Sequence, residues 1–128
     1  MIALSGPLGV GKTEFARGFI HTLAGRHGAA APEEVPSPTF TLVQSYDLSR
    51  VTVWHFDLYR LVRPEDAEEL GLDEALAEGI ALIEWPERLG DRLPRERLDL
   101  ALAYADAPER RVAALTGHGA WRGRLADA

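Results

Sequence analysis

Apolar residues along the chain recur in patterns that predict its secondary structure. Between residues 13 and 24 they recur every three or four positions, which is typical of an amphipathic helix, and glycines follow this segment. Residues 80–83 form a continuous apolar run of strand length, which predicts a central strand buried on both faces. The same reasoning predicts strands at 2–5, 40–46, 51–56, 98–104 and 111–115, short helices at 65–70 and 73–78, and at most a helical turn at 121–126.

These elements predict one α/β domain over residues 1–128, with a mixed central sheet flanked by helices. The strands at 40–46 and 51–56 are separated by four residues, which predicts a hairpin. The segment 29–38 contains three prolines and is predicted to be a loop. A chain of 128 residues can bury a core without a disulfide or metal to hold it.

Composition excludes several classes of function. The chain has no cysteine, which excludes thiol catalysis, thiolate zinc sites and disulfides, and fits a cytoplasmic protein. It shows no signal peptide and no apolar segment long enough to span a bilayer, so we expect a soluble protein without a membrane partner. The net charge of -6 and the scattered basic residues weigh against tight direct binding of tRNA or DNA.

The segment from Gly6 to Thr13 matches the phosphate-binding pattern G-x-x-x-x-G-K-[ST] at every position. Its glycines let successive N–H groups turn toward phosphate oxygens, and the following helix adds the positive end of its dipole. In this pattern Lys12 reaches the outer phosphates and the Thr13 hydroxyl ligates magnesium. The flanking predicted strand and helix complete the features of a P-loop NTPase-like domain. We expect the nucleotide to be surrounded by Gly6, Leu8, Gly9, Val10, Gly11, Lys12, Thr13 and Glu14.

Two acidic residues that follow predicted strands are candidates for the magnesium side of this site. Glu84 follows 80–83, where P-loop proteins place an acid that orients the metal or the attacking water. The alternative for Glu84 is an ordinary carboxylate beyond a strand. Asp57 follows the strand at 51–56 and is the second candidate. His55 is interpreted as packing or hydrogen bonding, because no second histidine stands at metal-ligand spacing.

The loop from Ser37 to Thr41 has two interpretations. Its hydroxyl groups, Thr39 among them, stand on a proline-stiffened segment that could sense a γ-phosphate or its magnesium, as switch loops do. The other interpretation is a turn that enters a strand.

The residue types present favour ATP over GTP. GTPases commonly read guanine with an Asn-Lys-x-Asp segment. This chain has no asparagine, and Lys12 is its single lysine, so that segment cannot exist here.

Five blocks of residues stand along the chain in a set order, at 8–18, 37–43, 55–61, 69–71 and 82–87. Together they resemble the bacterial TsaE (YjeE) family of ATPases, which serve tRNA threonylcarbamoyladenosine synthesis. The run His-Phe-Asp-Leu-Tyr-Arg at 55–60 and the run Glu-Trp-Pro-Glu at 84–87 are far more specific than the P-loop itself. The resemblance covers residues 6 to about 90.

This resemblance implies a magnesium-dependent ATPase that turns over slowly alone and works with the TsaD–TsaB heterodimer, which itself transfers the threonylcarbamoyl group. Contact with tRNA would be indirect, through that complex. The family implies that Lys12 cradles phosphates, that Thr13 and Glu84 serve magnesium, and that Asp57 assists the metal or the water. It also implies that Thr39 lies in the switch and that Trp85 lies beside the nucleotide.

The chain departs from the family at two places. Pro7 stands where family members commonly have an acid, which puts the role of that carboxylate in doubt here. Met1 directly precedes the first predicted strand, whereas family chains usually begin some twenty or more residues earlier with a segment that contacts adenine. We therefore expect the domain to lack a short N-terminal segment.

Two alternative functions remain open at this point. A small-molecule kinase would need a lid arginine, for which Arg60 or Arg63 could serve. A nucleotide-gated binding module would bind ATP in the same cradle and barely hydrolyse it.

Overall fold

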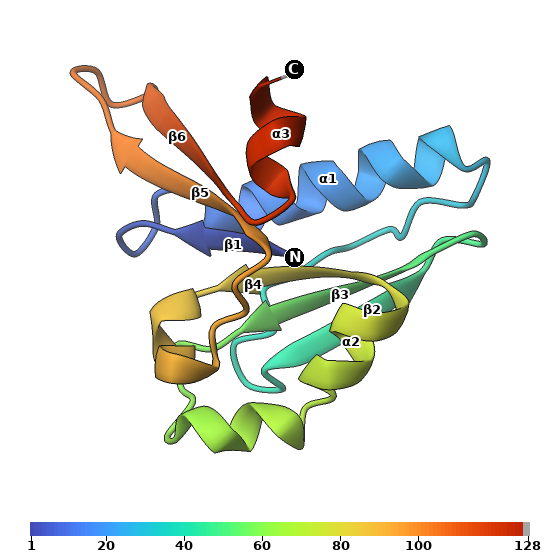
Figure 1. Ribbon diagram of the computed structural model, residues 1–128. Helices are drawn as coiled ribbons and strands as arrows, with labels where there is room; N and C mark the ends of the chain where they lie inside the picture. Colours follow the sequence, from blue (N-terminus) through green and yellow to red (C-terminus); the bar gives the residue numbers. More distant parts are fainter. Residues whose placement is uncertain (127–128) are drawn as a thin grey trace.

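The computed structural model describes residues 1–126 and contains a six-stranded sheet with helices on both of its faces (Figure 1). The strands are β1 (Ile2–Ser5), β2 (Val43–Asp47), β3 (Thr52–Asp57), β4 (Ile80–Glu84), β5 (Arg97–Tyr104) and β6 (Arg111–His118). The helices are α1 (Lys12–Arg26), α2 (Leu72–Glu78) and α3 (Trp121–Ala126), with two 3₁₀ segments, η1 (Pro64–Glu68) and η2 (Pro86–Arg92).

The strand order is β2-β3-β4-β1-β5-β6, and its centre is parallel. β1 pairs in parallel with β4 and β5, and β3 pairs in parallel with β4. The edge strands β2 and β6 are antiparallel to their neighbours. The predicted mixed sheet and α/β class are therefore confirmed. Parallel strands bring their carboxyl ends to one edge of the sheet, and this is where open α/β folds bind ligands.

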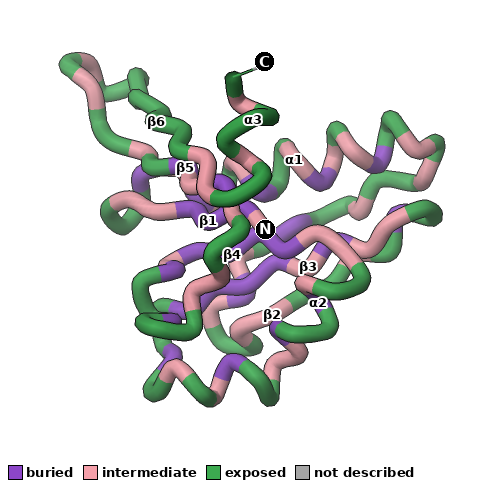
Figure 2. Tube along the Cα trace, viewed as in Figure 1, coloured by how far each residue is buried: buried purple, intermediate pink, exposed green. Residues whose placement is uncertain are grey.

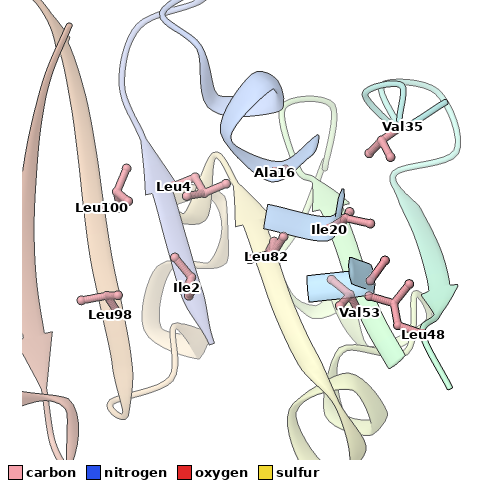
Figure 3. Close-up of a cluster of buried hydrophobic side chains, with 11 residues drawn as sticks. Ile2, Leu4, Ala16, Ile20, Val35, Leu48, Val53, Leu82, Leu98 and Leu100 are labelled. Atoms are coloured by element: carbon pink, nitrogen blue, oxygen red, sulfur yellow. The ribbon is translucent and has the colours of Figure 1, made fainter. Parts of the chain in front are cut away.

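Adjacent residues of β4 bury opposite faces of the sheet, because strand side chains alternate. Leu82 packs on the α1 face with Ile20 (Figure 3). Ile83 packs on the α2 face with Ala75. All four side chains are fully buried, and each large one contributes roughly 1.5–3 kcal/mol of hydrophobic stabilisation. Burial is concentrated in these central strands, whereas β6 is exposed over most of its length (Figure 2).

Most predicted elements are present, and the strand predicted at 80–83 is the buried central strand β4. The strand predicted from residue 40 begins at Val43 instead. The cause is a turn, in which the Leu42 N–H donates to the Pro38 carbonyl at 2.7 Å and Leu42 has a positive φ of 68°. The helix predicted at 65–70 is the 3₁₀ segment η1, and the strand predicted at 111–115 continues to His118.

The segment η2 was not predicted. It begins immediately after Trp85, which adopts the left-handed conformation at φ 59° and ψ 52°. The chain therefore turns sharply at the end of β4, which places the Trp85 side chain at the same sheet edge as the P-loop. Within residues 1–126, no helix has the length and apolar character needed to cross a membrane.

Candidate functional site

The P-loop, residues 6–13, leads from the carboxyl end of β1 into the start of α1 (Figure 1). Gly11 is the N-cap of α1 with a φ of 121°, and no side chain caps this helix end. The first N–H groups of a helix have no partner within the helix, so an uncapped end is available to an anion. Gly6 has a φ of 141° and lies so close to β5 that an added Cβ would be 2.5 Å from the Leu102 carbonyl oxygen.

Lys12 is held inside the loop with 5% of its surface exposed. Its Nζ donates to the carbonyl oxygens of Gly6 at 2.5 Å and Pro7 at 3.1 Å, and lies 3.9 Å from the centre of the Trp85 ring. Burial lowers the pKa of Lys12 below its ordinary value of 10.5. The carboxylates of Glu84, Glu87 and Asp57 act in the opposite direction. The ammonium group is therefore held inside the loop and poorly solvated.

Thr13 and Glu84 meet across the junction of α1 and β4. The Thr13 hydroxyl lies 3.1 Å and 3.0 Å from the two carboxylate oxygens of Glu84. Glu84 ends β4 and is 3% exposed. The register that places Leu4 of β1 opposite Glu84 explains the meeting, because the P-loop leaves β1 one residue later.

Asp57 lies beside Glu84 in the register of β3 and β4 and anchors the predicted switch loop. Its Oδ2 accepts a hydrogen bond from the Ser37 hydroxyl at 2.7 Å, and the Thr39 hydroxyl lies 3.2 Å from that of Ser37. Its Oδ1 accepts from the backbone N–H of Tyr59 at 3.1 Å. The loop from Ser37 to Thr41 is thus a turn that is also tied to a buried acid of the site. Its role as a switch that senses a γ-phosphate stays a prediction.

Trp85 covers one side of this arrangement. Its ring packs at 4.9 Å, tilted by 54°, against the ring of Tyr59. On the opposite side of the loop, the Tyr104 hydroxyl donates to the Leu8 carbonyl at 3.3 Å, and Arg111 Nε donates to the Val10 carbonyl at 2.9 Å. The ends of β5 and β6 therefore support the P-loop from behind.

The P-loop, the two acids, the loop at Ser37 and the Trp85 and Tyr59 rings surround a pocket of about 250 Å³. Of the predicted residues, Gly6 and Val10 stand outside its lining, since the Gly6 carbonyl binds Lys12 and the Val10 side chain is buried. Ser37 and Tyr59 belong to the lining although the sequence did not single them out individually. The hydroxyl-rich loop and the His-Phe-Asp-Leu-Tyr-Arg run were the signals that pointed to them. The lining residues are Leu8, Gly9, Gly11, Lys12, Thr13, Glu14, Ser37, Thr39, Asp57, Tyr59, Glu84 and Trp85.

The oxygen donors of this pocket fit magnesium bound together with phosphate better than they fit a metal ion bound by protein side chains alone. No cluster of three or more His, Asp or Glu side chains able to hold a metal occurs within the described chain. The site offers the Thr13 hydroxyl and the carboxylates of Glu84 and Asp57. Mg²⁺ is typically bound through one or two carboxylates together with substrate phosphates and water. The donor set fits that mode.

A larger hollow of about 470 Å³ follows the outer face of α1, between Glu14 and Arg26. Its lining is mainly apolar, and its polar side chains are Glu14, Thr22 and Arg26, without a glycine-rich loop or a pair of carboxylates beside them. The smaller pocket is therefore the candidate site, on the basis of its chemistry.

The central strands of the sheet are parallel, and its first strand leads through a glycine-rich loop into a helix without an N-terminal side-chain cap. An acid ends the adjacent strand. These features define a P-loop α/β protein. The family model described as "Threonylcarbamoyl adenosine biosynthesis protein TsaE" matches residues 1–112. The chain belongs to the TsaE family. This confirms the resemblance carried by the five sequence blocks.

Individual relatives support this assignment. The "tRNA threonylcarbamoyladenosine biosynthesis protein TsaE" of Rickettsia bellii is 41% identical over 110 residues, which cover 86% of this chain and 73% of that protein. The protein of the same name from Bacillus subtilis is 35% identical over 113 residues, which cover 88% of this chain and 66% of that protein. This chain thus matches about two thirds to three quarters of the length of these relatives.

A solved structure agrees with the fold. The crystal structure of YdiB from Bacillus subtilis is similar with a TM-score of 0.72 at 30% sequence identity. The similarity covers 98% of this chain and 73% of that chain.

Proposed function

We propose that this chain is a magnesium-dependent ATPase subunit of the tRNA threonylcarbamoyladenosine modification machinery. The observation that carries the proposal is the convergence of Lys12, Thr13 and Glu84 on one pocket beside an uncapped helix N-terminus. Each of these groups matches a requirement of phosphoryl chemistry, namely a cation for the phosphates, a hydroxyl for the metal and an acid beside both.

In this proposal the residues of the chain divide the work. Lys12 leaves the carbonyls of Gly6 and Pro7 to bind phosphate oxygens, which join the N–H groups of the loop. Thr13 and Glu84 hold Mg²⁺, which when bound neutralises charge on the phosphates. Asp57, two strands from the P-loop strand, orients the metal or the attacking water. Trp85 and Tyr59 limit access of solvent to the pocket.

ATP is the proposed nucleotide because the chain has no asparagine and its single lysine is Lys12, which excludes the guanine-reading segment of GTPases. The proposed partner is the TsaD–TsaB heterodimer, with tRNA reached through that complex in the cytoplasm. The net charge of -6 supports this indirect contact with tRNA.

The kinase alternative is less well supported. Arg60 lies 4.6 Å over the Phe40 ring, and Arg63 pairs with Glu65 and Asp66 on the surface. Neither arginine lines the P-loop pocket, so neither is placed as a lid over the phosphates.

The test is ATP hydrolysis by Glu84→Gln and by Glu78→Gln, a matched change at an exposed position at the end of α2. We expect a slow, magnesium-dependent rate in the unmodified protein, a loss of about 100-fold or more in Glu84→Gln, and no change in Glu78→Gln. Adding the TsaD–TsaB heterodimer should change the unmodified rate. Tight ATP binding with no hydrolysis, even with the heterodimer, would favour the nucleotide-gated module. Phosphorylation of a metabolite would favour the kinase.

A further inference from the structure

His55 is fully buried in the middle of β3, directly behind the candidate site. In the parallel pairing of β3 and β4, His55 lies opposite Leu82, and Asp57 lies opposite Glu84. Residues two apart on a strand face the same side, so His55, Asp57 and Glu84 share one face of the sheet. That face is the one on which Leu82 packs toward α1. His55 thus stands where the hydrophobic core ends and the polar site begins.

The imidazole makes one hydrogen bond, and its partner is Glu84. The His55 Nε2 lies 2.6 Å from Glu84 Oε2. An ionised carboxylate only accepts hydrogen bonds, so Nε2 carries the hydrogen and donates it. The other ring nitrogen, Nδ1, is buried and has no partner among the described residues.

The Nδ1 of His55, which has no partner in the part of the chain that the structure describes, lowers the stability of the fold. A buried polar atom without a partner costs about 1–3 kcal/mol, and an apolar side chain of similar size would avoid that cost at this position. The carboxylate oxygen of Glu84 that His55 contacts also accepts a hydrogen bond from the Thr13 hydroxyl at 3.0 Å. The three side chains therefore form a chain of hydrogen bonds from the core to the P-loop helix.

We propose that His55 is a positioning residue that fixes the carboxylate of Glu84 toward Thr13 and the magnesium. The inference rests on the proposed function, and it deepens the account of its metal site. The terminal torsion of a glutamate has no sharp preferred angle, so a carboxylate without a fixed partner samples many orientations. The bond from Nε2 restricts this rotation before nucleotide arrives. Outer partners of metal-binding groups commonly affect metal affinity by about 10–100-fold.

Three substitutions separate this role from simple packing. In His55→Gln, the side chain is long enough to place its amide nitrogen near the position of Nε2, so it can still donate to Glu84. In His55→Asn, the shorter side chain places its amide near the position of Nδ1, out of reach of Glu84. His55→Leu has no donor. Calorimetric titration with ADP, in the presence of Mg²⁺ and in EDTA, gives for each variant the factor by which magnesium strengthens binding.

We expect magnesium to strengthen ADP binding by the same factor in the unmodified protein and in His55→Gln. In His55→Asn and His55→Leu this factor should be smaller by about tenfold or more. Affinity in EDTA should stay within about twofold in all variants. The proposal is overturned if the asparagine and leucine variants keep the magnesium factor, if the glutamine variant loses it equally, or if all variants lose affinity in EDTA as well. The glutamine and asparagine pair decides the question should the leucine variant fail to fold.

A second readout is independent of nucleotide and metal. A ¹⁵N-correlated NMR spectrum of the imidazole should show a hydrogen on Nε2 of His55, and its signal should shift in Glu84→Gln. An unchanged signal would overturn the bond to Glu84. Absence of magnesium-strengthened binding and of hydrolysis in the unmodified protein would instead count against the proposed function, whatever this spectrum shows.

Discussion

Replacing Gly6 with alanine is expected to lower the free energy of unfolding by about 2–5 kcal/mol and to impair nucleotide binding. Gly6 has a φ of 141°, and a side chain in the positive-φ region costs roughly 1–2 kcal/mol. The new Cβ would also lie 2.5 Å from the Leu102 carbonyl oxygen and 2.9 Å from Val10 Cγ1, closer than the 3.4 Å of an ordinary contact. Overpacking of this kind costs about 1–3 kcal/mol.

The clash cannot be relieved cheaply, because one of the two contacts is backbone. The Leu102 carbonyl belongs to β5, which is paired on both sides with β1 and β6. The P-loop backbone must therefore move instead. Its movement displaces the Gly6 carbonyl that holds Lys12, which connects the stability effect to nucleotide binding.

Gly18→Ala is the matched control. Gly18 lies in the interior of α1, and an added Cβ would have no heavy atom within 4 Å. Alanine is better than glycine inside a helix by about 0.5–1 kcal/mol, so this variant should be more stable than the unmodified protein. ATP binding should be unchanged.

Urea denaturation followed by tryptophan fluorescence measures both variants. With an m value of about 1–3 kcal/mol per molar urea, Gly6→Ala should lower the midpoint by roughly 1 M or more. Gly18→Ala should raise it. Equal midpoints for the two variants, or unimpaired ATP binding by Gly6→Ala, would refute the packing of the loop against β5.

Two further predictions concern the charges of the site. Burial lowers the pKa of Lys12 below 10.5, and bound phosphate should raise it again. Binding of ADP should therefore take up protons. The affinity for ADP should fall as the pH rises through the lowered pKa of Lys12. Calorimetry should show this dependence in the unmodified protein and a flat profile in Lys12→Arg, whose charge does not titrate; a flat profile in both would contradict the assignment to Lys12. Ser37→Ala removes the 2.7 Å hydrogen bond to Asp57, so hydrogen exchange in residues 36–42 should accelerate by about tenfold or more, whereas Ser45→Ala on β2 should leave the loop unchanged. Equal exchange in the two serine variants would show that this bond does not hold the loop.

Local patterns were sufficient where a single stretch of chain decides the structure. The apolar run at 80–83 became β4, because a strand without polar positions can only be buried on both faces. The helical spacing after Gly11 became α1 with its N-terminus at the P-loop. The sequence left the turn at Pro38 and Leu42 as one of two interpretations and began the strand too early, because this turn depends on a hydrogen bond and a positive φ that no periodicity reports.

The sequence by itself determined the P-loop, since the glycines, Lys12 and Thr13 lie within one stretch of eight residues and their backbone geometry is local. Tertiary structure decided which acids face it. Asp57 and Glu84 are 27 positions apart, and they meet because β3 and β4 pair in parallel with these two residues in register. The same pairing places His55 behind Glu84, and the reversal at Trp85 returns its ring to Lys12. Strand register is a property of the assembled sheet, because it is set by burial of whole faces, and it can be read only once the strands are side by side.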